Sequence, residues 1–188
     1  HPDVAVSLNN LANLYDNQGR YKEAEQLHKR ALAIREKFFG PEHPDVATSL
    51  SNLGNNYKAQ GRYKEAEPLF HRALAIDEKF FGREHLNFAK SLTNLASISN
   101  TQGNYNEAKQ LYKRALAITK KVFGTEHSEI AFSLNNLANL YHTEGHYNKA
   151  EPLFKRSLEI LEKFFGPENP KVASSLMNLG LNYYGQGR

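Results

Sequence analysis

The 188-residue sequence contains no cysteine, no tryptophan and a single methionine. Without cysteine the chain has no disulfide framework, no thiolate nucleophile and no cysteine-built zinc site, and this composition suits a reducing compartment such as the cytoplasm. No apolar run reaches the ~18 residues that a membrane-spanning helix needs, and the N-terminus lacks the charged-then-apolar plan of a signal peptide. We therefore expect a folded cytoplasmic protein without a membrane partner.

Repetition is what the sequence has in abundance. A 42-residue block begins at His1 and returns without a gap at His43, His85 and His127, and a further copy starts at Asn169 and continues for 20 residues. A fixed period of about 20 to 50 residues is typical of solenoid proteins. The predicted organisation is a single array over residues 1–188. Its full repeats are 1–42, 43–84, 85–126 and 127–168. Its half repeat, 169–188, is expected to form one helix that covers the apolar side of the fourth repeat.

Each block is predicted to form two helices. Glycine at its nineteenth and fortieth positions, such as Gly19 and Gly40, marks two helix ends, because glycine adopts the left-handed conformation at little cost. Winding the segment from Tyr21 to Phe39 at 100° per residue gathers its apolar side chains, Phe38 among them, on one side and most charged ones on the other. The apolar face expected for the preceding helix comprises Val4, Leu8, Leu11, Ala12 and Tyr15.

Proline also marks particular places in the blocks. Pro44 and Pro170 fit the first turn of a helix, where the missing N–H is not needed. Pro68 and Pro152 instead lie early in the second helices of their blocks, where proline deletes a backbone hydrogen bond and crowds the preceding turn. We expect either a kink or a late helix start at these two sites.

The block also resembles a known family. The spacing of Leu8, Leu11-Ala12, Tyr15, Gly19, Tyr21, Ala24 and Ala31 resembles the tetratricopeptide repeat. The period of 42, with HPDVA at the start and ALAIREKFFGPEHP at the junction, is similar to the kinesin light chain type of this repeat. The resemblance implies an all-α, right-handed solenoid of antiparallel helix pairs, in which first helices line a concave groove. It further implies a non-catalytic scaffold that binds an extended peptide of a protein partner in that groove.

The groove-facing positions of the first helices are unusually rich in asparagine. They lie opposite the apolar face, eleven of the 25 are asparagine, and only Lys90 is charged. An amide offers both donors and an acceptor, so this row is predicted to pair with the backbone of an extended peptide. The candidate peptide-binding residues are Asn10, Asn13, Asn52, Asn55, Lys90, Asn94, Ser97, Phe132, Asn136, Asn139 and Asn178. Lys90 is expected to favour an acidic residue or a terminal carboxylate, and Phe132 and Met177 an apolar anchor.

An alternative explanation is that duplication copied the asparagines and that their amides join neighbouring helices. The residues that differ between blocks favour the binding role: one groove position is occupied by Val6, Thr48, Lys90, Phe132 and Ser174. Variation on one face of a constant scaffold would encode preference for particular side chains. Drift on any exposed face would look similar, so both explanations stay open.

Metal binding and catalysis find little support in the sequence. The histidines that open the four blocks would lie roughly 10 Å apart, whereas zinc needs ligand atoms about 2 Å from the metal. They are expected to pack at helix starts. His142 and His146 flank Gly145 and do not form the H-E-x-x-H metal motif. With no phosphate-binding loop or nucleophile elbow either, we expect neither an enzyme nor a cofactor.

Two other kinds of partner are compatible with parts of the sequence. The net charge of +4 permits nucleic acid, but the lysines and arginines alternate with glutamates on the second helices, which is a solvated mixed face and not a basic stripe. RNA is therefore the weaker alternative. End-to-end self-association is the stronger one, because Gln186 to Arg188 stop where another block would continue and the end surfaces are shaped for a further repeat.

Overall fold

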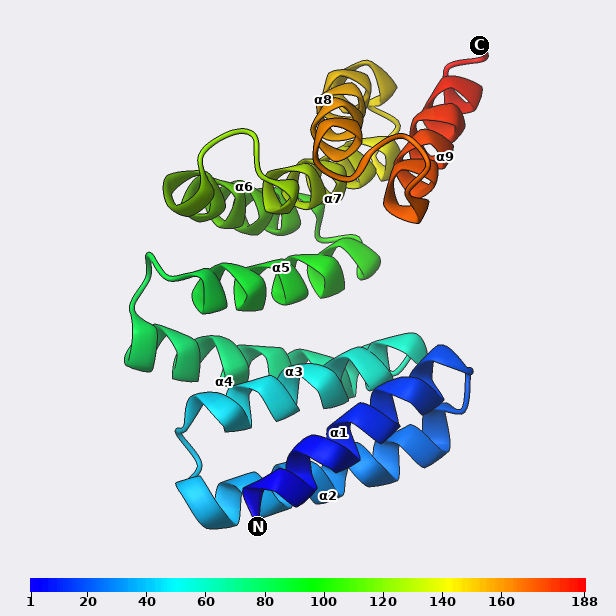
Figure 1. The fold of residues 1–188 in the computed structure, drawn as a ribbon. Coiled ribbons are helices and arrows are strands. Elements are labelled where there is room, and N and C mark those ends of the chain that lie inside the picture. The colour runs from blue at the N-terminus through cyan, green and yellow to red at the C-terminus, as the bar shows by residue number, and fades with distance from the viewer. The chain divides into compact units, whose positions relative to one another are not determined.

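The computed structural model describes all residues from His1 to Arg188 and contains nine α-helices. Two helices form in each full block and one in the half block, as predicted, and α1/α2, α3/α4 and α7/α8 pack as antiparallel pairs, as Figure 1 shows for α1 and α2. The helices are α1 (Pro2–Asn17), α2 (Tyr21–Phe39), α3 (Pro44–Ala59), α4 (Tyr63–Phe81), α5 (Leu86–Thr101), α6 (Tyr105–Phe123), α7 (Ser128–Thr143), α8 (Tyr147–Phe165) and α9 (Pro170–Gly185). The chain divides near the end of α5 into two compact units, residues 1–98 and 99–188.

The helix ends follow the sequence signals. Gly40 has a φ of +85°, and its N–H donates to the carbonyl of Glu36 at 3.0 Å. The next helix, α3, is capped by His43, whose Nδ1 accepts from the backbone N–H of Asp45 at 3.2 Å and whose ring stacks on Phe39 with 4.3 Å between centroids. The histidine thus caps a helix and packs at its start, which confirms the prediction.

The two early prolines do not delay their helices. α4 and α8 begin at the same block position as α2 and run through Pro68 and Pro152. The prediction of a late helix start at these two prolines, one of the two alternatives, is therefore wrong. Proline removes one backbone hydrogen bond, and we attribute the tolerance of Pro68 to the fully buried Ala66 and Phe70 beside it, which hold this turn against the core.

In the first unit the core joins small and large side chains across neighbouring helices. Val46, Leu50 and Ile76 form a buried cluster against which Leu32 of α2 packs. Nearby, a Cβ added to Gly54 would lie 2.8 Å from the ring of Phe70. The glycine is thus needed for the close approach of α3 to this ring.

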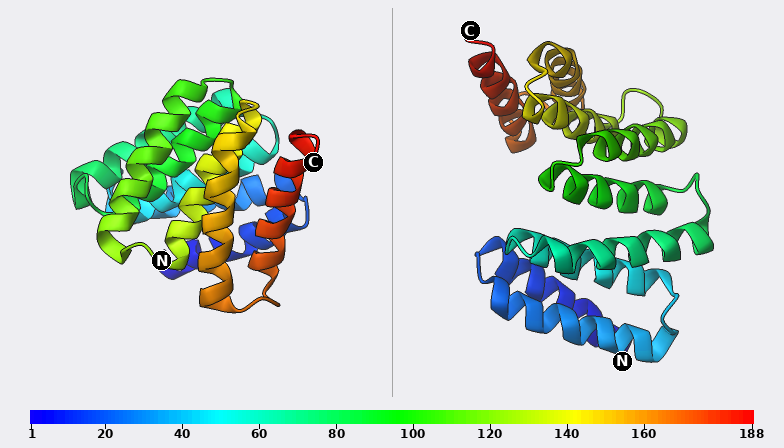
Figure 2. Two further views of the ribbon diagram at one scale, coloured as in Figure 1. Left: turned by 90° about the horizontal axis from the view of Figure 1, so that it is seen from above. Right: turned by 180° about the vertical axis from the view of Figure 1, so that it is seen from behind.

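In the second unit α9 covers the apolar side of the fourth repeat, as the sequence predicted. Leu179 packs with Ala138 of α7 and with Ala150 and Phe154 of α8. Figure 2 shows α9 beside α8 in both views. The half repeat therefore buries the surface that each full repeat presents to its successor.

Part of the expected apolar face is exposed. Val4 and Leu11 are 43% and 40% exposed, whereas the equivalent Val46 and Leu53 are buried. The reason is that α3 packs against the preceding α2, while α1 has no such neighbour in the structure. Phe38 was also expected inside but is 61% exposed and rests edge-on against Phe39, because it lies in the last turn of α2, beyond Arg35, the last buried residue of the helix.

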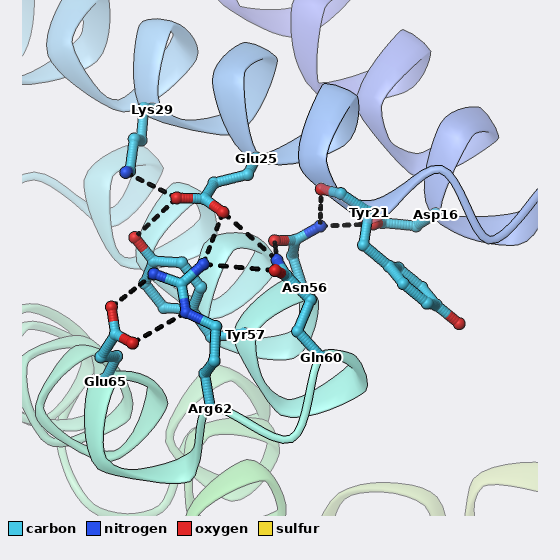
Figure 3. A network of polar contacts seen from close by, with 9 residues as sticks. All are labelled: Asp16, Tyr21, Glu25, Lys29, Asn56, Tyr57, Gln60, Arg62 and Glu65. Atoms are coloured by element: carbon cyan, nitrogen blue, oxygen red, sulfur yellow. Dashed lines mark hydrogen bonds and ion pairs between the residues drawn. The ribbon is translucent and has the colours of Figure 1, made fainter.

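A polar network ties the first repeat to the second, as Figure 3 shows. The Glu25 carboxylate of α2 accepts from Lys29 Nζ and Arg62 Nη1, each at 2.6 Å, from Gln60 Nε2 at 3.3 Å and from the Tyr57 hydroxyl at 3.4 Å. Burial alone would raise the pKa of Glu25, but the hydrogen bonds from Lys29, Gln60 and Arg62 lower it to about 2. The Glu25 carboxylate thus finds its hydrogen-bond partners within the protein, and these contacts hold the first and second repeats together.

Candidate functional site

A hollow of about 340 Å³ lies between α3 and α5, and we call it the α3/α5 hollow. The predicted binding residues Asn52 and Asn55 reach it from α3, and Lys90 and Asn94 reach it from α5. The sequence reasoning therefore named four residues that the fold brings to one place. The complete lining is Ala47, Thr48, Ser51, Asn52, Asn55, Asp77, Asn87, Lys90, Ser91 and Asn94.

The asparagines of this hollow keep their amides free. The side chains of Asn52, Asn55 and Asn94 form no hydrogen bond with another protein group. Asn55 is exposed and the other two are half-buried. An amide of this kind presents its oxygen and both N–H donors to whatever enters. Pairing between neighbouring helices does not account for these three residues.

Pairing between helices does occur elsewhere, at positions that do not line the hollow. Asn9 of α1 is one of the eleven asparagines that helical winding places at groove-facing positions, but in the structure it is 4% exposed. Its Nδ2 donates to Ser49 Oγ at 3.3 Å, and its Oδ1 lies 3.0 Å from Nδ1 of the fully buried His28. Helical winding places Asn9 incorrectly, because its amide hydrogen-bonds to Ser49 of the next repeat and to the buried His28 of α2, and these contacts bury the side chain.

The remaining predicted residues are distributed over several helices. Ser97 accepts a hydrogen bond from Lys58 Nζ at 3.0 Å and is thus already engaged. The ring of Phe132 is half-buried, with the ammonium of Lys171 at 5.2 Å from its centroid. Asn10 and Asn13 are exposed on α1; Asn136 and Asn139 lie on α7 and Asn178 on α9 of the second unit.

Asp77 is the lining residue that sequence reasoning missed. It belongs to α4, a second helix, is 6% exposed, and accepts a hydrogen bond from Ser91 Oγ at 2.6 Å. Burial raises the pKa of Asp77, although the Ser91 bond and the field of His85 lower it in part. A signal was present: helical winding puts this block position inside the apolar arc of the second helix, so its charge is out of pattern.

The position of Asp77 is occupied by chemically different residues in the other repeats. The surface beneath the first helices therefore varies from repeat to repeat. In the first repeat Arg35 is 7% exposed, and its Nη1 donates to the Asp45 carbonyl and to Ser49 Oγ, both at 2.9 Å. Thr119 and Leu161 take this position in the third and fourth repeats. The arginine is thus satisfied by two acceptors, whereas Asp77 has one hydroxyl donor.

Lys90 stands at the rim of the hollow. Its side chain is exposed and has no carboxylate within ion-pair distance. A cation in this setting is free to attract an anion from solution, although its exposure limits the gain to about 1 kcal/mol or less. The site therefore combines free amides, an unpaired cation at the rim and a nearly unpaired anion at the floor.

Comparisons with known proteins agree with this architecture. A tetratricopeptide repeat model matches residues 3–79, 87–163 and 147–188, and a second tetratricopeptide repeat model matches residues 51–121. No curated protein matches the chain. None of its helices is long and apolar enough to cross a membrane.

Solved structures resemble the whole chain. A kinesin light chain-like protein of Podosopora anserina with nearly identical TPR-like repeats is 30% identical; the match covers 100% of this chain and 89% of that one, with a TM-score of 0.79. A point variant of that protein gives the same identity and TM-score, with 100% and 88% covered. BtubC from P. vanneervenii is 26% identical over 99% of this chain and 74% of that chain, with a TM-score of 0.81.

Proposed function

Because this chain belongs to the tetratricopeptide repeat family, we propose that it is a non-catalytic protein-interaction module that binds an extended segment of a protein partner on its first helices. The α3/α5 hollow is the anchor of this binding. The observation that carries the proposal is that Asn52, Asn55 and Asn94 converge on one hollow with no partner inside the protein. The absence of cysteine supports a reducing compartment such as the cytoplasm for this interaction.

The chemistry of the hollow suits an extended backbone. A peptide bond offers one N–H donor and one C=O acceptor, and a single asparagine amide can satisfy both. Each such hydrogen bond contributes about 0.5–1.5 kcal/mol net, so two or three amides hold a segment without reading its side chains. A volume of about 340 Å³ accommodates a few side chains of such a segment and not a folded domain.

Side-chain preference then comes from the charged residues. Lys90 at the rim supports a partner segment that carries an acidic residue or a terminal carboxylate. The exposed position of this lysine makes the pairing sensitive to salt. We therefore include an acidic group in the proposed partner segment.

The test is a selection of random 12-residue peptides on the intact protein, followed by calorimetry. Replacing both Asn52 and Asn94 by alanine should weaken binding of a selected peptide about tenfold or more, since two hydrogen bonds are lost. Asn106→Ala, on the exposed side of α6, is the matched control and should change nothing. Unchanged affinity in the double variant, with a circular dichroism spectrum like that of the wild type, would refute the proposal.

A further inference from the structure

The floor and the rim of the α3/α5 hollow carry opposite charges. Among its ten lining residues Asp77 is the single carboxylate and Lys90 the single cation. Asp77 belongs to α4 and is buried, whereas Lys90 belongs to α5 and is exposed. A ligand that fills the hollow therefore meets a negative group at depth and a positive group at the entrance.

Asp77 lacks the partners that a buried carboxylate needs. An ionised carboxylate accepts about four hydrogen bonds, but only the Ser91 hydroxyl donates to Asp77. No ammonium or guanidinium lies within ion-pair distance, and the nearby His85 acts on Asp77 only through its field. Burying a charge without a counter-charge is costly, so a cation that entered the hollow would relieve a cost already present in the fold.

The surroundings narrow the chemistry of that cation. No group of three or more acidic or histidine side chains gathers here as a metal would require. The walls are instead amides and hydroxyls, including Ser51, Asn52 and Asn94. These oxygens accept the further N–H donors that an arginine or lysine head carries, while the open hollow leaves room for its aliphatic stem.

We propose that the α3/α5 hollow takes a basic side chain of the bound segment, whose charged head pairs with Asp77 while a carboxylate of the same segment pairs with Lys90. This inference rests on the proposed function, because it assigns a side chain to the segment held by the asparagines. It identifies the partner as a peptide with arginine or lysine close to an acidic group. It also gives Asp77 the role of a specificity-determining residue.

The same random 12-residue display library tests the inference when it is panned in parallel on the wild type, Asp77→Asn and Lys90→Ala. Wild-type pools should be enriched in arginine or lysine together with acidic residues. Asp77→Asn should lose the basic enrichment and keep the acidic one, and Lys90→Ala should do the reverse. Asparagine has the shape of aspartate and still accepts from Ser91, so the fold should persist.

A double-mutant cycle then measures the contact. Replacing the selected basic residue by glutamine should weaken binding to the wild type about tenfold or more and to Asp77→Asn less than threefold. The matched control is Glu107→Gln, an equal charge change at an exposed site on α6, which should behave as the wild type.

The outcomes separate the two proposals. Peptides that depend on Asn52 and Asn94 but show no basic enrichment, or equal losses on the wild type and Asp77→Asn, would overturn the Asp77 assignment alone. Pools with no enriched sequence, or binding indifferent to the asparagine variants, would overturn the proposed function and this inference together.

Discussion

Glu25 and Asp77 are both buried carboxylates of the first unit, yet their surroundings shift the pKa in opposite directions. Glu25 receives hydrogen bonds from Lys29 and Arg62 among others, and its pKa falls to about 2. Asp77 receives one hydrogen bond from Ser91, and burial raises its pKa. The difference separates a structural carboxylate from a candidate binding residue. Glu25 is hydrogen-bonded by several side chains of the protein and holds neighbouring repeats together. Asp77 has a single hydrogen-bond donor and lines a hollow, which makes it a candidate for binding.

The contact between the third and fourth repeats has a different arrangement of charges from the Glu25 network. At the position of Glu25 the third repeat has Lys109, and at the position of Gln60 the fourth repeat has Glu144. Lys109 Nζ donates to Glu144 Oε1 at 3.0 Å, so the polarity is reversed and the contact is kept. Junctions between repeats thus require complementary side chains and not a particular sign.

The largest effect is expected from breaking the saturated site. Glu25→Ala should lower the free energy of unfolding by about 2 kcal/mol, because Lys29 and Arg62 lose a nearly buried acceptor. Glu23→Ala, which removes an exposed partner of Arg20, should cost far less, because exposed ion pairs contribute little to stability. Urea denaturation of the two variants checks this, and equal losses would show that the Glu25 network adds nothing.

The reversed junction should show coupling of intermediate size. Lys109→Glu and Glu144→Lys should each destabilise the protein by about 1 kcal/mol, since like charges then face each other. The double swap should regain most of this loss by restoring the pair in the opposite order. Thermal unfolding of the four proteins gives the coupling energy, and strictly additive losses would contradict the requirement for complementarity.

Lowering the pH should change the contributions of Glu25 and Asp77 to stability in opposite directions. The folded-state pKa of Glu25 lies below its ordinary value of 4.5, so its contribution to stability is present above pH 4.5 and is lost as the pH falls toward 2. The pKa of Asp77 is raised above 3.8, so its contribution has the opposite sign: stability is gained as the pH falls through the folded pKa.

Variants turn this sign difference into a measurement. Between pH 7 and pH 3, Glu25→Gln should lose less stability than the wild type, and Asp77→Asn should lose more while being more stable at pH 7. The free energy of unfolding at both pH values checks each variant. Parallel pH profiles for all three proteins would remove the distinction between the two sites.

The smallest effect on stability is expected at the free amides. Asn52→Ala should change the free energy of unfolding by less than about 0.5 kcal/mol, since it breaks no hydrogen bond within the protein. The matched variant Asn56→Ala loses bonds to Asp16 Oδ1 at 2.6 Å and to the Tyr21 carbonyl at 2.9 Å and should cost about 1–2 kcal/mol. Equal costs would mean that Asn52 has a structural role.

The sequence predicted the fold more completely than it predicted the residues of the binding site. The period, Gly40 and the amphipathic segment from Tyr21 to Phe39 predicted the helices, because such signals are local. The burial of Asn9 and of Asp77 was missed, since it depends on which side chains the neighbouring helices supply. The row of first-helix asparagines was visible by winding, whereas the floor beneath it comes from second helices.

The most direct measurement of the central claim is a titration of the isotopically labelled protein with a selected peptide, followed through the side-chain amide signals of its asparagines by NMR. We predict that the signals of Asn52, Asn55 and Asn94 shift together and saturate at one peptide per chain, while those of Asn106 and Asn148 on the second helices stay in place. Shifts confined to the second-helix asparagines would contradict binding in the α3/α5 hollow.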